Sequence, residues 1–281
     1  MENIGYYNGR IAPISEISIP MTDRAVYFGD GVYEFCICKN GVPYLLEEHI
    51  DRFFSSMAKV RIKPNFTKDE LAAIMTDLAS RVDLQYAGLY WQISRGAAKR
   101  AHIFPKDTTP CIYATVTPSK LPDFSKEIKC ILRPDVRFLM CDVKTIDLLP
   151  SVLAAQEAEE NGAVECILHR DGRVTECAHS NVSILKGGVL ITAPTDNLIL
   201  PGIARAHLIS AAKRLGATVE ERAYSTDELY DADEIIVTST TKFALRCTTL
   251  EDRAVGGRDG ELFYKLQAEV LREFDEYMEK R

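Results

Sequence analysis

The stretch from residue 164 to 192 reads VECILHRDGRVTECAHSNVSILKGGVLIT and carries two hairpin signals. Asp171-Gly172 separates two mostly apolar runs, and Gly187-Gly188 separates the next two. Asp-Gly and Gly-Gly pairs tolerate the positive φ angles that two-residue hairpin turns require. The stretch therefore predicts two consecutive β-hairpins in the second half of the chain.

The first half carries the same kind of signal at Asn8-Gly9 and Asn40-Gly41, which predict two more hairpins. Other segments have apolar residues every three to four positions, as on one face of a helix. These segments predict helices that begin near His49, cover 71–78, follow Pro150, and span 203–215 and 262–278. Strands and helices in both halves indicate an α+β fold.

The chain has 281 residues, which suggests about two domains. A Pro- and Ser-containing stretch at 118–126 is typical of a linker. We therefore expect an N-terminal domain at 1–118, an interdomain linker at 119–127, and a C-terminal domain at 128–281.

Composition excludes several classes of protein and of partner. With 34 Lys and Arg against 41 Asp and Glu, the net charge is −7, and no basic run predicts binding to nucleic acid or to an anionic membrane. No apolar run approaches the roughly 18 residues of a membrane span, and the polar start Met1-Glu2-Asn3 is unlike a signal peptide. The 8 cysteines include no C-x-x-C pair. We expect buried free thiols, no metal site, and a cytoplasmic protein.

Two residues could carry chemistry, although each also has a simpler interpretation. Lys144 precedes an apolar helix, where a lysine is usually a solvated charge but can be a Schiff-base amine if half-buried. Glu176 ends a predicted strand, where it is either an exposed tip or a buried carboxylate that could hold a protonated ring nitrogen.

Two segments could bind an anion. Pro201-Gly202 precedes a helix whose first amides lack partners, and such helix starts can bind phosphate, although most bind nothing. Residues 234–241, EIIVTSTT, predict a strand that runs into four hydroxyl residues, which suits a phosphate or is a plain polar strand end. The P-loop and Rossmann glycine patterns are both missing from the sequence.

Arg100 and His102 stand two positions apart, so in an extended segment both side chains point to one side. Two such donors could hold a carboxylate, or the segment could be a loop with scattered charge.

These signals recur together, in this order, in one family. The chain resembles the fold type IV pyridoxal-phosphate aminotransferases from about residue 5 to 270, and within them most the branch that acts on D-amino acids, marked by Arg100-x-His102. The resemblance rests on the following motifs: Gly29-Asp-Gly-Val-Tyr-Glu34, His49-Ile-Asp-Arg52, Lys144, Arg173-Val-Thr-Glu176, Ser180-Asn181, Gly202-Ile203 and Thr238-Ser-Thr-Thr241. It implies a two-domain homodimer with a small N-terminal α/β domain and a larger, β-barrel-like C-terminal α/β domain.

The resemblance also implies a role for each residue toward pyridoxal 5′-phosphate. Lys144 would form the Schiff base and shuttle a proton, and Glu176 would pair with the pyridine nitrogen. Leu200 would pack against the ring. Arg52, the amides of Ile203 and Ala204, and Thr240 would hold the phosphate. Tyr33, Arg100 and His102 would grip the substrate carboxylate, the last two from a second subunit.

The implied reaction equilibrates D-alanine and 2-oxoglutarate with pyruvate and D-glutamate. Alternatives are an aminotransferase for L-branched-chain amino acids, an aminodeoxychorismate lyase of the same fold, and a non-catalytic binding protein. Arg100-x-His102 argues against the first alternative.

The chain departs from the family pattern at two places. Ala204 stands where a hydroxyl residue is common, and residues 242–246 read Lys-Phe-Ala-Leu-Arg. Lys242 or Arg246 could favour a substrate with a second carboxylate, and the alternative is a solvated loop.

Overall fold

The computed structural model describes residues 3–281, and its contacts divide the chain into two compact units. The first unit comprises residues 1–121, 143–147 and 277–281, and the second comprises 122–142 and 148–276. The chain passes from one unit to the other between Leu121 and Pro122, inside the segment predicted as a linker. The short segment that carries Lys144 belongs to the first unit.

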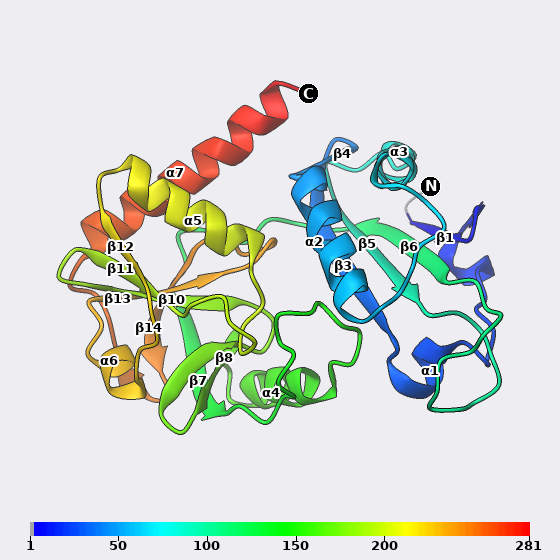
Figure 1. Ribbon diagram of the computed structural model, residues 1–281. Helices are drawn as coiled ribbons and strands as arrows, with labels where there is room; N and C mark the ends of the chain where they lie inside the picture. The colour runs from blue at the N-terminus through cyan, green and yellow to red at the C-terminus, as the bar shows by residue number, and fades with distance from the viewer. Residues whose placement is uncertain (1–2) are drawn as a thin grey trace. The chain divides into compact units, whose positions relative to one another are not determined.

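The first unit is built on an antiparallel sheet of six strands in the order β2-β1-β6-β5-β3-β4 (Figure 1). Its strands are β1 (Ile4–Tyr7), β2 (Arg10–Ala12), β3 (Gly31–Lys39), β4 (Val42–Pro43), β5 (Tyr86–Ser94) and β6 (Cys111–Pro118). Its helical segments are η1 (Ile14–Glu16), α1 (Arg24–Phe28), α2 (Leu46–Lys59) and α3 (Lys68–Ser80). The hairpins predicted at Asn8-Gly9 and Asn40-Gly41 are confirmed as β1–β2 and β3–β4.

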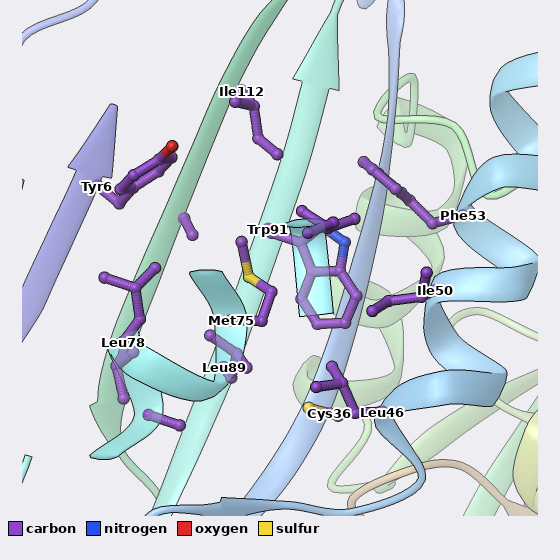
Figure 2. Packing of buried hydrophobic residues seen from close by; sticks show 14 of the residues in the cluster. Tyr6, Cys36, Leu46, Ile50, Phe53, Met75, Leu78, Leu89, Trp91 and Ile112 are labelled. Carbon is purple, nitrogen blue, oxygen red and sulfur yellow. The ribbon is translucent and has the colours of Figure 1, made fainter. Parts of the chain in front are cut away.

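Helices α2 and α3 supply one side of the core of this unit. Phe53 of α2 and Met75 of α3 pack with Trp91 and Leu89 of β5 (Figure 2). Alternation along β5 sends Leu89 and Trp91 into the core and Tyr90 and Gln92 to the opposite face. Helix α2 begins three residues before the predicted start, because Leu45 adopts a left-handed conformation with φ 53° and turns the chain into the helix.

The second unit contains a mixed sheet of nine strands, ordered β12-β11-β10-β13-β14-β7-β8-β9 with β15 beside β14. Its strands are β7 (Ile128–Pro134), β8 (Glu165–Arg170), β9 (Arg173–Cys177), β10 (Asn181–Lys186), β11 (Val189–Thr192), β12 (Thr218–Glu221), β13 (Glu234–Thr238), β14 (Leu245–Leu250) and β15 (Arg253–Ala254). Its helices are α4 (Leu149–Glu160), α5 (Ile203–Arg214), α6 (Thr226–Tyr230) and α7 (Gly260–Glu279), the last of which ends within the first unit. The two predicted hairpins of this half are confirmed as β8–β9 and β10–β11.

The sheet of the second unit curls toward a barrel. Strand β12 lies at one edge and β9 at the other. The chain that follows β12 bonds to the β8–β9 hairpin. The Val174 amide of β9 donates to the Tyr224 carbonyl at 3.0 Å, and the Thr226 amide donates to the carbonyl of Gly172 in the turn before β9 at 2.8 Å. These bonds draw the two edges together, which confirms the predicted α+β fold with a barrel-like second part.

Seven of the eight cysteines are buried free thiols, and Cys141 is half-buried. None of the helices in residues 3–281 is long and apolar enough to cross a membrane. Within the same residues, His, Cys, Asp and Glu form no group suited to hold a metal ion.

Trp91 gives a direct test of the first core. It is fully buried and meets the Phe53 ring edge-on, with 6.0 Å between the ring centroids. We expect Trp91→Ala to lower the free energy of unfolding by about 3–5 kcal/mol, because it leaves a large cavity. Urea denaturation followed by circular dichroism measures this loss, and Trp91→Phe should lose less. A loss below about 1 kcal/mol for Trp91→Ala would contradict the packing described here.

Candidate active site

Lys144 is fixed against the start of β3. Its carbonyl accepts a hydrogen bond from the Tyr33 amide at 2.9 Å, and its amide donates to the Ser56 hydroxyl of α2 at 3.2 Å. The residue is half-buried, and its Nζ atom lies 4.2 Å from the centroid of the Tyr33 ring. The backbone of this lysine is therefore held on both sides, and its amine is presented beside an aromatic ring.

The other face of β3 carries a buried ion pair. Glu34 is fully buried and faces α2, where Arg52 donates to both its oxygens at 2.7 and 2.9 Å and His49 Nδ1 lies 2.8 Å from Oε2. Burial alone would raise the pKa of the Glu34 carboxyl, but the Arg52 charge and the hydrogen bonds from Arg52 and His49 outweigh it and bring the pKa to about 2. Glu34 thus orients Arg52, the predicted phosphate ligand.

Arg100 and His102 lie on an exposed loop and share one neighbour. The Arg100 Cζ atom is 5.2 Å from the centroid of the Phe28 ring, and the His102 ring is 5.4 Å from it. Arg24 of α1 also holds the loop, because its guanidinium donates to the Ala101 carbonyl at 2.6 Å. The structure thus brings Arg100 and His102 together. Tyr33, the third residue predicted to bind the substrate carboxylate, contacts Lys144 and Tyr90.

Glu176 lies at the centre of the polar contacts in the second unit. It is buried, and an Arg137 nitrogen donates to Oε1. The Asn181 amide group and the Leu200 backbone N–H donate to Oε2 at 2.9 and 3.1 Å. Three donors, one of them charged, favour an ionised carboxylate at this position. The alternative that Glu176 is an exposed strand tip is therefore wrong.

The start of helix α5 borders the same asparagine. Gly202 is the N-cap residue, and no side chain caps the helix. A Cβ atom at Gly202 would lie 1.9 Å from the Asn181 Oδ1 atom, so only glycine fits there. The amides of Ile203 and Ala204 open the helix and have no partner within it.

Strand β13 ends beside Asn181, which also borders the helix start, and leads into a turn with hydroxyl side chains at residues 239–241, here called the hydroxyl turn. Thr238 pairs with Asn181 across the strands, and its buried hydroxyl has no partner among residues 3–281. Thr240 follows in the turn and is half-buried. A buried hydroxyl with no partner among residues 3–281, helix amides with no partner within the helix, and a position that admits only glycine fit a phosphate group. The Glu176 carboxylate fits a protonated ring nitrogen.

Several site residues had no assigned role in the sequence argument. Asp135 bonds to Arg137 at 2.8 and 2.9 Å and so holds the arginine that reaches Glu176. Asp30 pairs with Arg24 and Arg95 at the base of the Arg100 loop. Asp30 stands in a quoted motif, but nothing in the sequence tells which arginines approach it.

The cations of the unusual segment 242–246 are already paired. Arg246 donates to both oxygens of Glu234 at 2.7 and 2.8 Å, and Lys242 Nζ lies 3.2 Å from a Glu165 oxygen. Because buried carboxylates occupy both cations, the hypothesis that they favour a second substrate carboxylate has no support from this geometry.

Comparison with known proteins identifies the family. The amino-transferase class IV family matches residues 31–250. The chain belongs to this family. It is 37% identical over 264 residues to the D-alanine aminotransferase of Bacillus licheniformis, covering 93% of both chains. It is 35% identical to the D-alanine aminotransferase of Listeria monocytogenes over 95% of this chain and 94% of that one.

The solved structures place the fold. The branched-chain amino acid aminotransferase from Escherichia coli superposes with a TM-score of 0.86 at 24% identity, over 95% of this chain and 92% of that chain. A branched-chain amino acid aminotransferase from T.th., crystallised with pyridoxamine 5′-phosphate, superposes with a TM-score of 0.88 at 23% identity and the same coverage of both chains. The fold is therefore that of a fold type IV aminotransferase, as the motifs predicted.

The Glu34 ion pair predicts a pH-dependent stability. A carboxyl whose pKa falls from 4.5 to about 2 on folding stabilises the fold above pH 4.5, and this contribution is lost as the pH falls toward 2. We expect Glu34→Gln to lower the free energy of unfolding by about 3–5 kcal/mol at pH 7, since Arg52 loses its two charge-assisted bonds to the Glu34 carboxylate. Below pH 4.5 the difference in the free energy of unfolding between Glu34→Gln and the wild type should become smaller.

Urea denaturation of both proteins across this pH range measures the difference. Asp51→Asn is the matched control, because Asp51 also lies on α2 but pairs with Lys68 in an exposed position. A Glu34→Gln difference that stays constant from about pH 7 to pH 3 would exclude the ion pair as its cause.

Proposed function

We propose that the protein is a pyridoxal-phosphate-dependent D-amino acid aminotransferase that equilibrates D-alanine and 2-oxoglutarate with pyruvate and D-glutamate. The observation that carries the proposal is the pair Arg100 and His102, presented together on one exposed loop against Phe28. Two adjacent donors suit the α-carboxylate of an amino acid. The likeness to proteins named D-alanine aminotransferase supports the same substrate class.

The cofactor, when bound, supplies an aldehyde that joins the substrate amine and a protonated ring that accepts electrons from Cα. Lys144 would hold the cofactor through its Nζ atom and would move the proton at the substrate Cα, for which its fixed backbone and half-buried side chain are suited. Glu176 would hold the proton on the ring nitrogen, because a carboxylate that accepts from three donors is a suitable anionic partner. Leu200 would pack against the ring.

The helix amides of Ile203 and Ala204 would bind the phosphate together with Thr240. The Arg52 guanidinium, which Glu34 orients, is assigned to the same group. Because Ala204 has no hydroxyl, its contribution is the backbone N–H alone. Tyr33 joins Arg100 and His102 in holding the substrate carboxylate. A carboxylate fixed in this way decides which Cα hydrogen faces the lysine, so the preference for one enantiomer follows from orientation.

A homodimer is part of the proposal, with Arg100 and His102 reaching the site of the second subunit. Their loop and the segment that leads into helix α1 expose large apolar side chains, including Ile103 at 79% and Met21 at 85%. Such groups on a water-facing surface are typical of a protein interface. Buried free thiols suit a reducing compartment, and we place the enzyme in the cytoplasm.

The test is a half-reaction without any 2-oxo acid. Purified holoenzyme is mixed separately with D-alanine, L-alanine and L-leucine, and absorbance follows conversion of the cofactor from its aldehyde to its amine form. We expect conversion with D-alanine at least about tenfold faster than with either L-amino acid, which corresponds to about 1.4 kcal/mol in the barrier. Fast conversion with L-leucine and none with D-alanine would favour the branched-chain alternative.

A further inference from the structure

Four polar side chains from three separate segments meet beside the turn that connects β9, which contains Glu176, with β10. Glu165 begins β8, His179 and Ser180 lie in the turn between β9 and β10, and Lys242 lies in the turn between β13 and β14. The Lys242 Nζ atom is 2.8 Å from His179 Nε2, 3.2 Å from Ser180 Oγ and 3.2 Å from Glu165 Oε2. The Ser180 hydroxyl donates to Glu165 Oε2 at 2.7 Å, and His179 Nδ1 lies 3.1 Å from Oε1.

The two charges of this cluster are buried and satisfied. Glu165 is 0% exposed and Lys242 is 8% exposed. An ammonium group only donates, so His179 accepts at Nε2 and carries its proton on Nδ1, toward Glu165. Burial would raise the pKa of the Glu165 carboxyl, but His179, Lys242 and Ser180 together bring it to about 2. Lys242 therefore uses its three donors within the cluster and has none left for a substrate.

The backbone of Lys242 also forms hydrogen bonds within the hydroxyl turn. Its backbone N–H lies 3.2 Å from the Ser239 carbonyl oxygen and 3.2 Å from the Ser239 hydroxyl. Its side chain then crosses to the turn that connects Glu176 with Asn181. The same residue thus contacts the turn that contains Thr240 and the turn that follows Glu176.

We propose that Lys242 and Glu165 are positioning residues for the cofactor, which hold the phosphate-binding turn at a fixed place relative to Glu176. The inference rests on the proposed function, because Thr240 and Glu176 are assigned there to opposite ends of one ligand. A buried ion pair often adds no more stability than a well-packed apolar pair of similar volume. An apolar pair could not replace the directional hydrogen bonds by which Lys242 connects the two turns.

The experiment measures binding of pyridoxamine 5′-phosphate to the apoenzyme by calorimetry. This ligand has no aldehyde and therefore forms no covalent bond to Lys144. Its affinity reports the non-covalent binding of the ring and the phosphate. We expect Lys242→Met to weaken binding by about tenfold or more. Lys186→Met is the matched control, because Lys186 pairs with Asp231 at 2.7 Å on the surface of the same unit and should leave the affinity within about twofold.

His179 provides a milder variant and a rescue. Its side chain is 53% exposed, so substitution does not open the core. His179→Ala removes the acceptor of Lys242 and should weaken binding several-fold. His179→Gln keeps an acceptor and a donor at the end of the side chain and should restore most of the affinity. If Lys242→Met does not fold, this pair decides the question by the same measurement.

The outcomes separate the two proposals. A wild-type apoenzyme that binds neither pyridoxal nor pyridoxamine phosphate refutes the proposed function, and the role of Lys242 with it. A wild type that binds, with Lys242→Met equal to it in affinity, overturns only the positioning role. A lower melting temperature of the Lys242→Met apoenzyme at unchanged affinity also overturns that role, since it marks a purely structural residue.

Discussion

The arrangement of the second unit depends on keeping one carboxylate charged inside the protein. Burial disfavours the ionised form, so Glu176 needs donors, and it has them from Arg137, Asn181 and the Leu200 backbone. Arg137 is itself fixed, by its bonds to Asp135. A carboxylate held by three donors is the partner that we propose for a protonated ring nitrogen.

The first unit applies the same principle to its cations. Glu34, inside the core face of β3, aligns the Arg52 guanidinium, and Asp30 shares its charge between Arg24 and Arg95 at the base of the Arg100 loop. Lys144 differs, because backbone bonds fix it and its ammonium lies 4.2 Å from the centroid of the Tyr33 ring. Among residues 3–281 no carboxylate forms an ion pair with this lysine, and such an amine suits covalent chemistry better than one locked in an ion pair.

Local sequence signals predicted the local structure. Four turn dipeptides gave four hairpins, because positive φ angles at Asn, Asp and Gly are properties of the residues themselves. Helical periodicity located the long helices, whereas α1 and α6, with five residues each, are too short to have a readable period. The bonds that draw β9 toward the chain after β12 depend on distant pairing, which no local pattern encodes.

The candidate site was predictable in its residues but not in its partners. The motifs singled out Arg52 and Glu176, and family resemblance suggested their roles. Neither composition nor spacing could tell that Glu34 faces Arg52 across the core. Lys242 is the clearest case, since an isolated lysine in a polar turn is usually solvated, and only the fold brings Glu165 and His179 to it.

The most direct test of the account is to reduce the holoenzyme with borohydride and map the modified peptide by mass spectrometry. Reduction makes a bond between a lysine and the cofactor permanent. The account predicts that the cofactor mass is found on the peptide that contains Lys144 and on no other. A modified peptide that contains a different lysine, or a protein that carries no cofactor mass after incubation with pyridoxal 5′-phosphate, would contradict it.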